Sequence, residues 1–213
     1  MSIGAAAYGA ERLIASCGVT AAVAPVVSVR DLGARGDGET NDTRAFQLAS
    51  AAIVAAGGGT LRIPPGVYVI GRQVAATTAE AGFAYRAESV IDIRGCRRPV
   101  VIDGRGAVLR CAAGLRLGAF DARTGRPHQP RVMPFIDPTY RADIYYGALH
   151  FERNRSVRVT GVEVDGNIDA IALGGEYGDR GYQVSHDGLV AIANGEILVD
   201  GAYFHHHGRD GIM

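Results

Sequence analysis

The sequence predicts an all-β solenoid, in which short strands stack coil upon coil, with an α-helix covering its N-terminal end. Three observations lead to this fold class: one amphipathic helical stretch near the N-terminus, short apolar runs separated by Gly, Asp and Asn after it, and an internal repeat in the last third of the chain. A terminal coil would expose core and unpaired strand edges, so we expect the helix to act as a cap.

The predicted helix follows Asn41–Thr43, residue types that often cap helix N-termini. Apolar residues then recur with the spacing of one helix face over about four turns. Gly57–Gly59 end the helix, because glycine takes the left-handed conformation freely. The predicted apolar stripe consists of Ala45, Leu48, Ala49, Ala52, Ile53 and Ala56.

Two short β runs, at 60–63 and 67–70, follow the glycines around the turn tripeptide Pro64-Pro65-Gly66. We expect them to form a hairpin-like pair. Residues 71–89 are expected to be irregular and partly helical. Regular coils begin near residue 90, and the proline-rich excursion at 117–146 has the length of a functional loop.

The last third of the chain repeats itself. Two passes beginning at Gly147 and Asp187 align without gaps at an offset of 40, and Asp187-Gly188-Leu189 recurs as Asp210-Gly211-Ile212 at an offset of 23. We take about 23 residues as one coil and 168–186 as an inserted loop, since repeats of this length are typical of solenoids. The chain stops within a new coil, so we expect either the N-terminal part of a longer protein or an end closed by self-association.

The stretch from Asp31 to Tyr68 carries Asp-Leu-Gly-Ala-Arg-Gly-Asp-Gly, Asn-Asp-Thr, Gly-Gly-Gly-Thr and Pro-Pro-Gly-x-Tyr. This pattern resembles the N-terminal signature of the pectate-lyase-like superfamily, which includes pectate lyases, polygalacturonases, rhamnogalacturonases, alginate epimerases and phage tailspikes. The resemblance implies a single-stranded right-handed parallel β-helix with an N-terminal capping α-helix. It concerns the cap and identifies no active site.

The expected organisation is a leader or signal segment at 1–27 and the N-terminal part of a β-helix domain, truncated at its C-terminus, at 28–213, with the cap at 28–70 and coils at 90–213. Ala22-x-Ala24 has the form of a signal cleavage site, which favours a secreted or cell-surface protein; an irregular leader is the alternative. No apolar run is long enough to span a membrane.

Composition limits the chemistry. Acidic and basic residues balance at 22 each, which argues against nucleic acid as the main partner. Every basic residue is arginine, so no lysine-dependent mechanism can use these residues. Cys17, Cys96 and Cys111 have no metal-type spacing, and we expect Cys96 and Cys111 to be free buried thiols rather than a disulfide.

The repeat predicts the first candidate site. It places Tyr146, His186 and Arg209 in one column and Gly147, Asp187 and Asp210 in the next, about 4.8 Å apart between coils. Stacked carboxylates raise a pKa or hold a cation, and paired carboxylates serve glycoside hydrolysis. An arginine beside carboxylates and Ca²⁺ serves a lyase instead. We therefore predict a catalytic set, and the alternative is a structural Asp-Gly turn. The predicted set is Asp187, Asp210, Arg209 and His186.

The run His205-His206-His207 is the second candidate. Strand alternation would place His205 and His207 on one face and His206 on the other, so no metal site is predicted. Sugar binding or proton transfer remains open beside a solvated corner. Asp165-Gly-Asn167 also resembles a sequence near the uronate groove of alginate epimerases. The predicted substrate-binding residues are Tyr146, Asp165, Asn167, His205 and His207.

Together with the resemblance, these residues predict a carbohydrate-active enzyme acting on an acidic, pectin- or alginate-like polysaccharide. The reaction is glycosidic hydrolysis or β-elimination/epimerisation, with Ca²⁺ as the one cofactor left open. The alternative is a non-catalytic glycan-binding solenoid, such as a tailspike-like or surface adhesin that forms a homotrimer.

Overall fold

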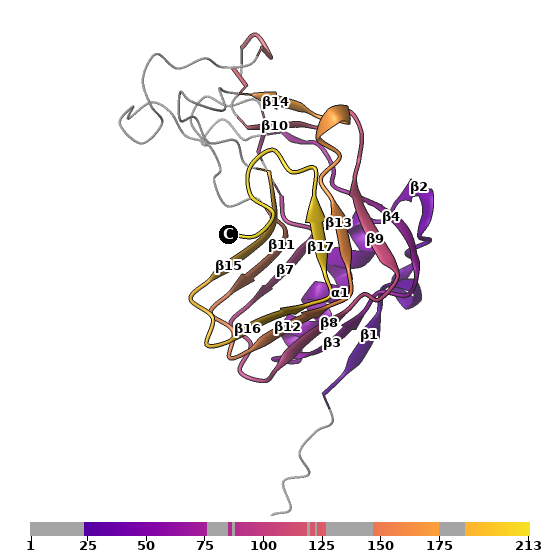
Figure 1. Ribbon diagram of the computed structural model, residues 1–213, viewed down its shortest axis with the longest axis vertical. Coiled ribbons are helices and arrows are strands. Elements are labelled where there is room, and N and C mark those ends of the chain that lie inside the picture. The colour runs from indigo at the N-terminus through magenta and orange to yellow at the C-terminus, as the bar shows by residue number, and fades with distance from the viewer. Residues whose placement is uncertain are drawn as a thin grey trace, which may run out of the picture.

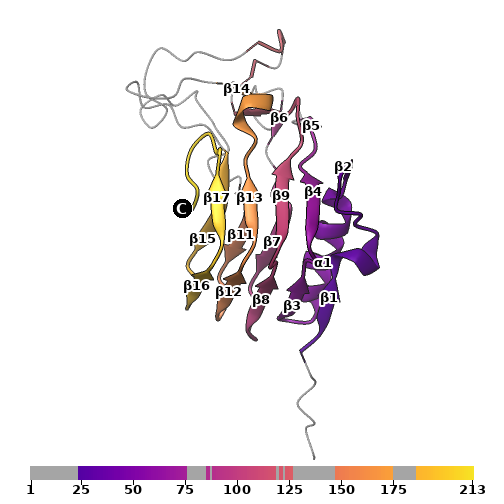
Figure 2. The same ribbon diagram turned by 45° about the vertical axis from the view of Figure 1, so that its right-hand side comes forward.

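The computed structural model describes residues 24–75, 85–86, 88–118, 120–121, 123–126, 147–174 and 186–213. In this part of the chain, three parallel sheets form the walls of a stack of coils (Figure 1). Helix α1 (Thr43–Ala55) lies at one end of the stack and the C-terminus at the other (Figure 2). The predicted parallel β-helix with an N-terminal capping helix is confirmed.

The three coils that begin in the third sheet contribute one strand to each sheet. The first sheet contains β1 (Val26–Ser28), β3 (Gly59–Arg62), β8 (Val100–Asp103), β12 (Val157–Thr160) and β16 (Ile197–Asp200). The second contains β2 (Asp37–Asn41), β4 (Gly66–Ile70), β9 (Ala107–Cys111), β13 (Glu163–Asp165) and β17 (Tyr203–His205). The third contains β7 (Ile91–Arg94), β11 (Gly147–Glu152) and β15 (Asp187–Ile192). Strands β1 to β4, which precede β7, belong only to the first and second sheets.

The strand register confirms the repeat. Gly147 pairs with Asp187, and β12 with β16 and β13 with β17 keep the same offset of 40. The bridge between Leu189 and Ile212 continues the stack at the shorter offset of 23. The extra residues between β13 and β15 include the 3₁₀ turn η2 (Ile168–Ala170) and β14 (Ala172–Gly174), which pairs with β10 (Arg116–Gly118).

Helix α1 covers the end of the core, in contact with β1, β3 and β7. The predicted stripe is partly wrong: Ala45, Ala49 and Ile53 are buried, but Leu48 is 38% exposed and Ala52 is exposed as well. Phe46 and Ser50 complete the buried face instead. The large Phe46 ring packs edge-on against the Tyr68 ring, with centroids 5.4 Å apart. This contact favours the rotation of the helix that buries Phe46.

Asp42 lies at the predicted N-terminus of α1, but its carboxylate bonds elsewhere. Its two oxygens accept hydrogen bonds from the backbone N–H groups of Arg35 and Gly36, at 2.7 and 3.0 Å. The Asn41 side chain instead accepts a bond from the Thr43 N–H. Asp42 therefore ties the glycine-rich turn before β2 to the cap, and η1 (Val29–Leu32) precedes that turn.

The hairpin-like pairing expected for 60–63 and 67–70 is wrong. Strand β3 pairs with β1 and β8 in the first sheet, whereas β4 pairs with β2 and β9 in the second. The Pro64-Pro65-Gly66 tripeptide turns a corner between sheets, where proline has no ladder bond to lose. Within the described part of 71–89, β5 (Val74–Ala75) pairs antiparallel with β6 (Tyr85–Arg86). Much of the rest of the segment that we expect to be partly helical lies outside the described residues.

Three further details bear on the expectations from the sequence. Cys96 and Cys111 are both buried and do not form a disulfide with each other, as expected. None of the described helices is long and apolar enough to cross a membrane. Strand β1 begins at Val26, so pairing starts two residues before the expected domain boundary.

A buried asparagine closes the corner between the third and first sheets. Asn154 is 2% exposed and accepts a bond from the Cys96 N–H at 2.9 Å. Its amide donates to the Ile93 carbonyl and to Asn194 Oδ1 of the next coil, at 2.9 and 3.0 Å. Asn194 repeats the arrangement by donating to the Phe151 carbonyl. This ladder satisfies backbone groups that the strands leave unpaired.

We predict that Asn154→Ala lowers the free energy of unfolding by about 2–4 kcal/mol, because it leaves a buried N–H and a buried carbonyl unsatisfied. Urea denaturation measures the change. Asn194→Ala, whose side chain is half-buried at the last complete coil, should cost less. Equal effects of the two substitutions would contradict a burial-dependent role.

Candidate functional site on the second sheet

Three polar side chains form a row on the outer face of the second sheet. Asp165 pairs in register with Arg110 on one side and with His205 on the other. Their neighbours Leu109 and Val164 are fully buried, and Phe204 packs against the same core. Because successive side chains alternate across a strand, Arg110, Asp165 and His205 point outward. We call these three residues the outer row.

Asp165 is the centre of the outer row. Its Oδ2 accepts a bond from Arg110 Nε at 3.0 Å, and its Oδ1 accepts the Asn167 N–H at 2.9 Å. Burial by itself would raise the pKa of this carboxyl, but these bonds, together with His205 and His206, hold it below its ordinary value. Asp165 is therefore an ionised, oriented carboxylate.

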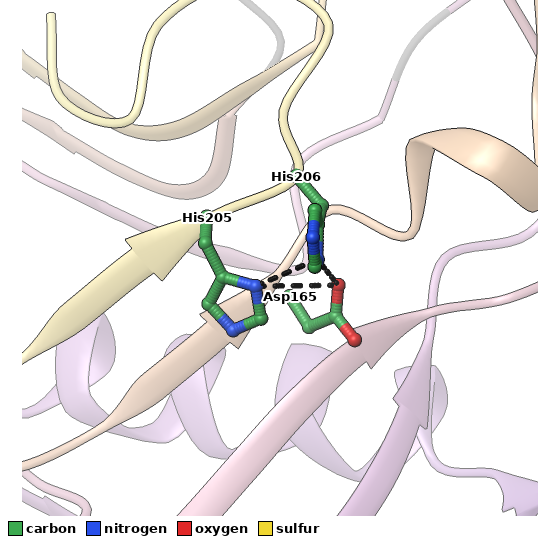
Figure 3. A group of neighbouring side chains, drawn as sticks. All are labelled: Asp165, His205 and His206. Carbon is green, nitrogen blue, oxygen red and sulfur yellow. Dashed lines mark hydrogen bonds and ion pairs between the residues drawn. The ribbon is translucent and has the colours of Figure 1, made fainter.

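His205 is fixed on three sides. Its ring stacks on Tyr203 with centroids 4.4 Å apart, and its Nε2 lies 3.2 Å from Glu163 Oε1. Its Nδ1 lies 2.8 Å from His206 Nδ1 and 3.8 Å from Asp165 Oδ1. Figure 3 shows the two histidine rings and the Asp165 carboxylate turned toward one another.

The expected alternation of the three histidines is wrong. His206 has a left-handed backbone, with φ +54°, directly after β17 ends. This turn keeps the His206 ring beside His205, with Nδ1 3.3 Å from Asp165 Oδ1 and the side chain 61% exposed. His207 turns inward instead, and its Nε2 lies 3.3 Å from the Val164 carbonyl.

His186 and His207 form a separate, inner pair. Their ring centroids lie 5.5 Å apart, and His186 Nδ1 accepts the Gly208 N–H at 2.9 Å. Burial lowers the pKa of His186 from 6.5 to about 4, and the neighbouring His207 adds to the shift. Burial likewise lowers the pKa of His207 to about 4. Both rings are neutral at pH 7.

Asp187 and Asp210 lie in adjacent coils, as the repeat predicts, but in different environments. Asp187 is fully buried and its Oδ1 accepts the Asp210 N–H at 3.1 Å. Burial raises the pKa of Asp187 to about 6, although Arg209 Nη1 lies 3.7 Å from its Oδ2. Asp210 is 48% exposed and pairs with Arg209 Nε at 3.2 Å.

The predicted residues thus divide into two groups. The outer group holds Asp165 and His205, with Asn167 bonding Asp165 through its N–H and the Cys111 carbonyl through its amide. The inner and corner group holds His186, Asp187, His207, Arg209 and Asp210. Tyr146 lies outside the described residues. A catalytic or binding role for any of them stays a prediction.

Sequence reasoning missed Arg110, Glu163 and His206. Arg110 precedes Asp165 by one coil, but the excursion at 117–146 hides that alignment in the sequence. Glu163 could have been found, since it lies two residues before Asp165 on the same strand and therefore shares its face. His206 could not, because only the left-handed turn places it there.

We predict that the free energy of unfolding falls as the pH drops from 6.5 to 4. The reason is that His186 takes up a proton near pH 6.5 in the unfolded chain but only near pH 4 in the folded protein. The shift corresponds to about 3 kcal/mol. His186→Asn should flatten this part of the profile, measured by urea denaturation at several pH values, while its Oδ1 still accepts the Gly208 N–H.

Asp187 acts in the opposite direction, since its raised pKa means that stability is lost as the pH rises from 3.8 to about 6. Both proteins retain Asp187, so its contribution cancels in the comparison. Parallel profiles for wild type and His186→Asn would contradict the assignment.

Comparisons with known proteins find local sequence similarity and partial structural similarity. Alginate lyase 7 of Azotobacter vinelandii is 54% identical over 41 residues, which are 19% of this chain and 5% of that protein. The A-modules of the mannuronan C-5 epimerases AlgE6 and AlgE4 of Azotobacter vinelandii are 22% and 19% identical, with TM-scores of 0.43 and 0.42. The matches cover 80% and 84% of this chain but 32% and 42% of those modules.

The strongest assignment comes from the cap. Residues 26–81 match the family described as rhamnogalacturonase A/epimerase, pectate lyase-like. This segment contains the glycine-rich turn, α1, β3 and β4, the elements that close the solenoid. The similarity to this family is therefore shown for the cap segment, and the parallel β-helix continues from it.

Proposed function

We propose that this chain is part of a carbohydrate-active enzyme that acts on an acidic, pectin- or alginate-like polysaccharide. The observation that carries the proposal is the outer row, which combines a guanidinium, a carboxylate and imidazole on one face of the β-helix. The family description names a rhamnogalacturonase and an epimerase, and the relative of 54% local identity is named an alginate lyase. Such polymers lie outside cells, so we also propose an extracellular site of action.

Arg110 carries the positive charge that binding of an anionic polysaccharide requires. Each uronate unit carries a carboxylate, and guanidinium groups bind carboxylates through paired N–H donors. The Arg110 side chain is 46% exposed and donates to Asp165 through Nε. Its Nη N–H groups are then left to donate to a ligand. A bound carboxylate would then lie beside His205 and His206.

The state of Asp165 favours proton abstraction over hydrolysis. Hydrolysis needs one carboxyl that stays protonated as a general acid, whereas the pKa of Asp165 is lowered. Asp187 has the raised pKa that a general acid needs, but it is fully buried. For elimination or epimerisation, a neutral imidazole removes the C5 proton while Arg110 stabilises the charge that develops on the carboxylate.

The two abstraction outcomes share their first step. After the C5–H bond breaks, loss of the C4 oxygen gives β-elimination, and return of a proton to the opposite face of C5 gives epimerisation. Hydrolysis remains the second candidate, through the paired carboxylates Asp187 and Asp210. A glycan-binding solenoid without turnover is the rival from another class.

We predict that Arg110→Gln lowers kcat/KM on a polyuronate by about 10–100-fold, through a lower kcat as well as a higher KM, because a charge-assisted hydrogen bond contributes about 1.5–3 kcal/mol and strengthens as charge develops on the carboxylate. Arg105→Gln is the matched control, since Arg105 is 72% exposed and pairs with Asp103 at a coil corner away from the outer row. Assays use polymannuronate, alginate and polygalacturonate, with and without Ca²⁺.

The products separate the reactions. Elimination leaves an unsaturated, ultraviolet-absorbing end, epimerisation exchanges the C5 hydrogen with deuterated solvent, and hydrolysis gives reducing ends without absorbance. If hydrolysis occurs and Asp187→Asn abolishes it, the inner carboxylates carry the reaction instead of the outer row. If the protein binds the polyuronates but turns over none of them, the proposed enzymatic function is wrong and the glycan-binding solenoid is favoured.

A further inference from the structure

Three side chains of types that can bind metals lie close together where β13 and β17 end. Asp165, His205 and His206 each offer one ligand atom, and these atoms lie within 4.8 Å of one another (Figure 3). The separations are 2.8 Å between the two Nδ1 atoms, 3.3 Å from His206 Nδ1 to Asp165 Oδ1, and 3.8 Å from His205 Nδ1 to the same oxygen. Tetrahedral Zn²⁺, with ligands at about 2.0–2.2 Å, places its ligand atoms about 3.3–3.5 Å apart, so the observed separations scatter around the required value.

The protonation of His205 is already suited to a metal. Its Nε2 lies 3.2 Å from Glu163 Oε1, and a carboxylate can only accept, so the ring proton is on Nε2. With the ring proton on Nε2, the Nδ1 lone pair faces His206 and Asp165. Metal-binding histidines commonly donate their other N–H to a carboxylate in this way, which fixes the ring and raises its basicity.

The other two ligands are also held in place. The Asn167 N–H and Arg110 orient the Asp165 carboxylate and leave its Oδ1 beside the histidines. The left-handed backbone at His206 holds its ring on the same side of the strand as His205. Because the His206 side chain is 61% exposed, a bound ion would keep a position open to water or to a small ligand.

We propose that Asp165, His205 and His206 bind a divalent transition-metal ion, with Zn²⁺ as the best match, through Asp165 Oδ1 and the two Nδ1 atoms. Two imidazoles and one carboxylate are typical of zinc and its neighbours, whereas Ca²⁺ requires six to eight oxygen ligands. Arg110 shares Asp165, and its positive charge weakens the site, so the ion exchanges readily. The proposal does not depend on the polysaccharide activity.

The test is metal binding by the untagged 213-residue chain, independent of any turnover. Calorimetric titration with Zn²⁺ should give one site per chain, and Co²⁺ should give the visible absorption of a tetrahedral ion. His206→Asn should weaken binding by about 100-fold or more, since it removes a ligand. Asparagine tolerates the left-handed backbone, so the corner should keep its fold, which circular dichroism checks.

Two further variants sharpen the result. Glu163→Gln removes the carboxylate behind His205 and should weaken Zn²⁺ by about 10–100-fold. Asp200→Asn removes an exposed carboxylate from β16 in the first sheet and should leave binding unchanged. The proposal is overturned if no stoichiometric binding occurs, or if His206→Asn binds as wild type does; the histidines then only hydrogen-bond one another.

Discussion

The in-register pairing of strands between coils is the constraint on which the rest of this structure depends. Residues 40 apart in the last two complete coils face each other across β11–β15, β12–β16 and β13–β17. The pairing of β13 with β9 likewise keeps Val164 beside Leu109 in the core and Asp165 beside Arg110 outside. A slip of one residue would exchange the two faces, burying the polar row and exposing the apolar one. Core packing and site geometry are therefore set by the same hydrogen bonds.

The corners between sheets decide how that regular pattern becomes a site. Asn167 and His206 both have left-handed backbones, with φ near +52° to +54°, where their strands end. At His206 the turn brings two consecutive histidines to one side, which a strand cannot do. At Asn167 it directs the backbone N–H toward the preceding Asp165. The corners that satisfy backbone hydrogen-bonding groups thus also position the side chains that could bind a ligand or take part in a reaction.

Burial separates the two polar groups at this end of the β-helix. His186 and Asp187 are fully buried, and burial lowers the pKa of His186 and raises the pKa of Asp187. Both shifts favour the neutral side chain. In the outer row, hydrogen bonds and the neighbouring cations outweigh the desolvation of Asp165 and keep it charged. At pH 7 His186 is therefore neutral, whereas Asp187 is mostly ionised and lies beside Arg209. In the outer row, Arg110 is the residue that presents its charge to solvent. The polysaccharide proposal and the metal proposal both use this outer charge.

The sequence by itself determined the solenoid, its capping helix, the coil offsets of 40 and 23, and the stacking of Asp187 on Asp210. Local periodicity and a gapless repeat carry that information, because each coil must bury the same apolar positions. Only the tertiary structure decided that Asp187 points inward, that His206 joins His205, and that Arg110 lies beside Asp165 across 55 positions of sequence. These outcomes depend on a left-handed corner and on a long excursion between coils. Neither leaves a periodic signal, since a backbone turn and a variable insertion are settled by packing against the neighbouring coil.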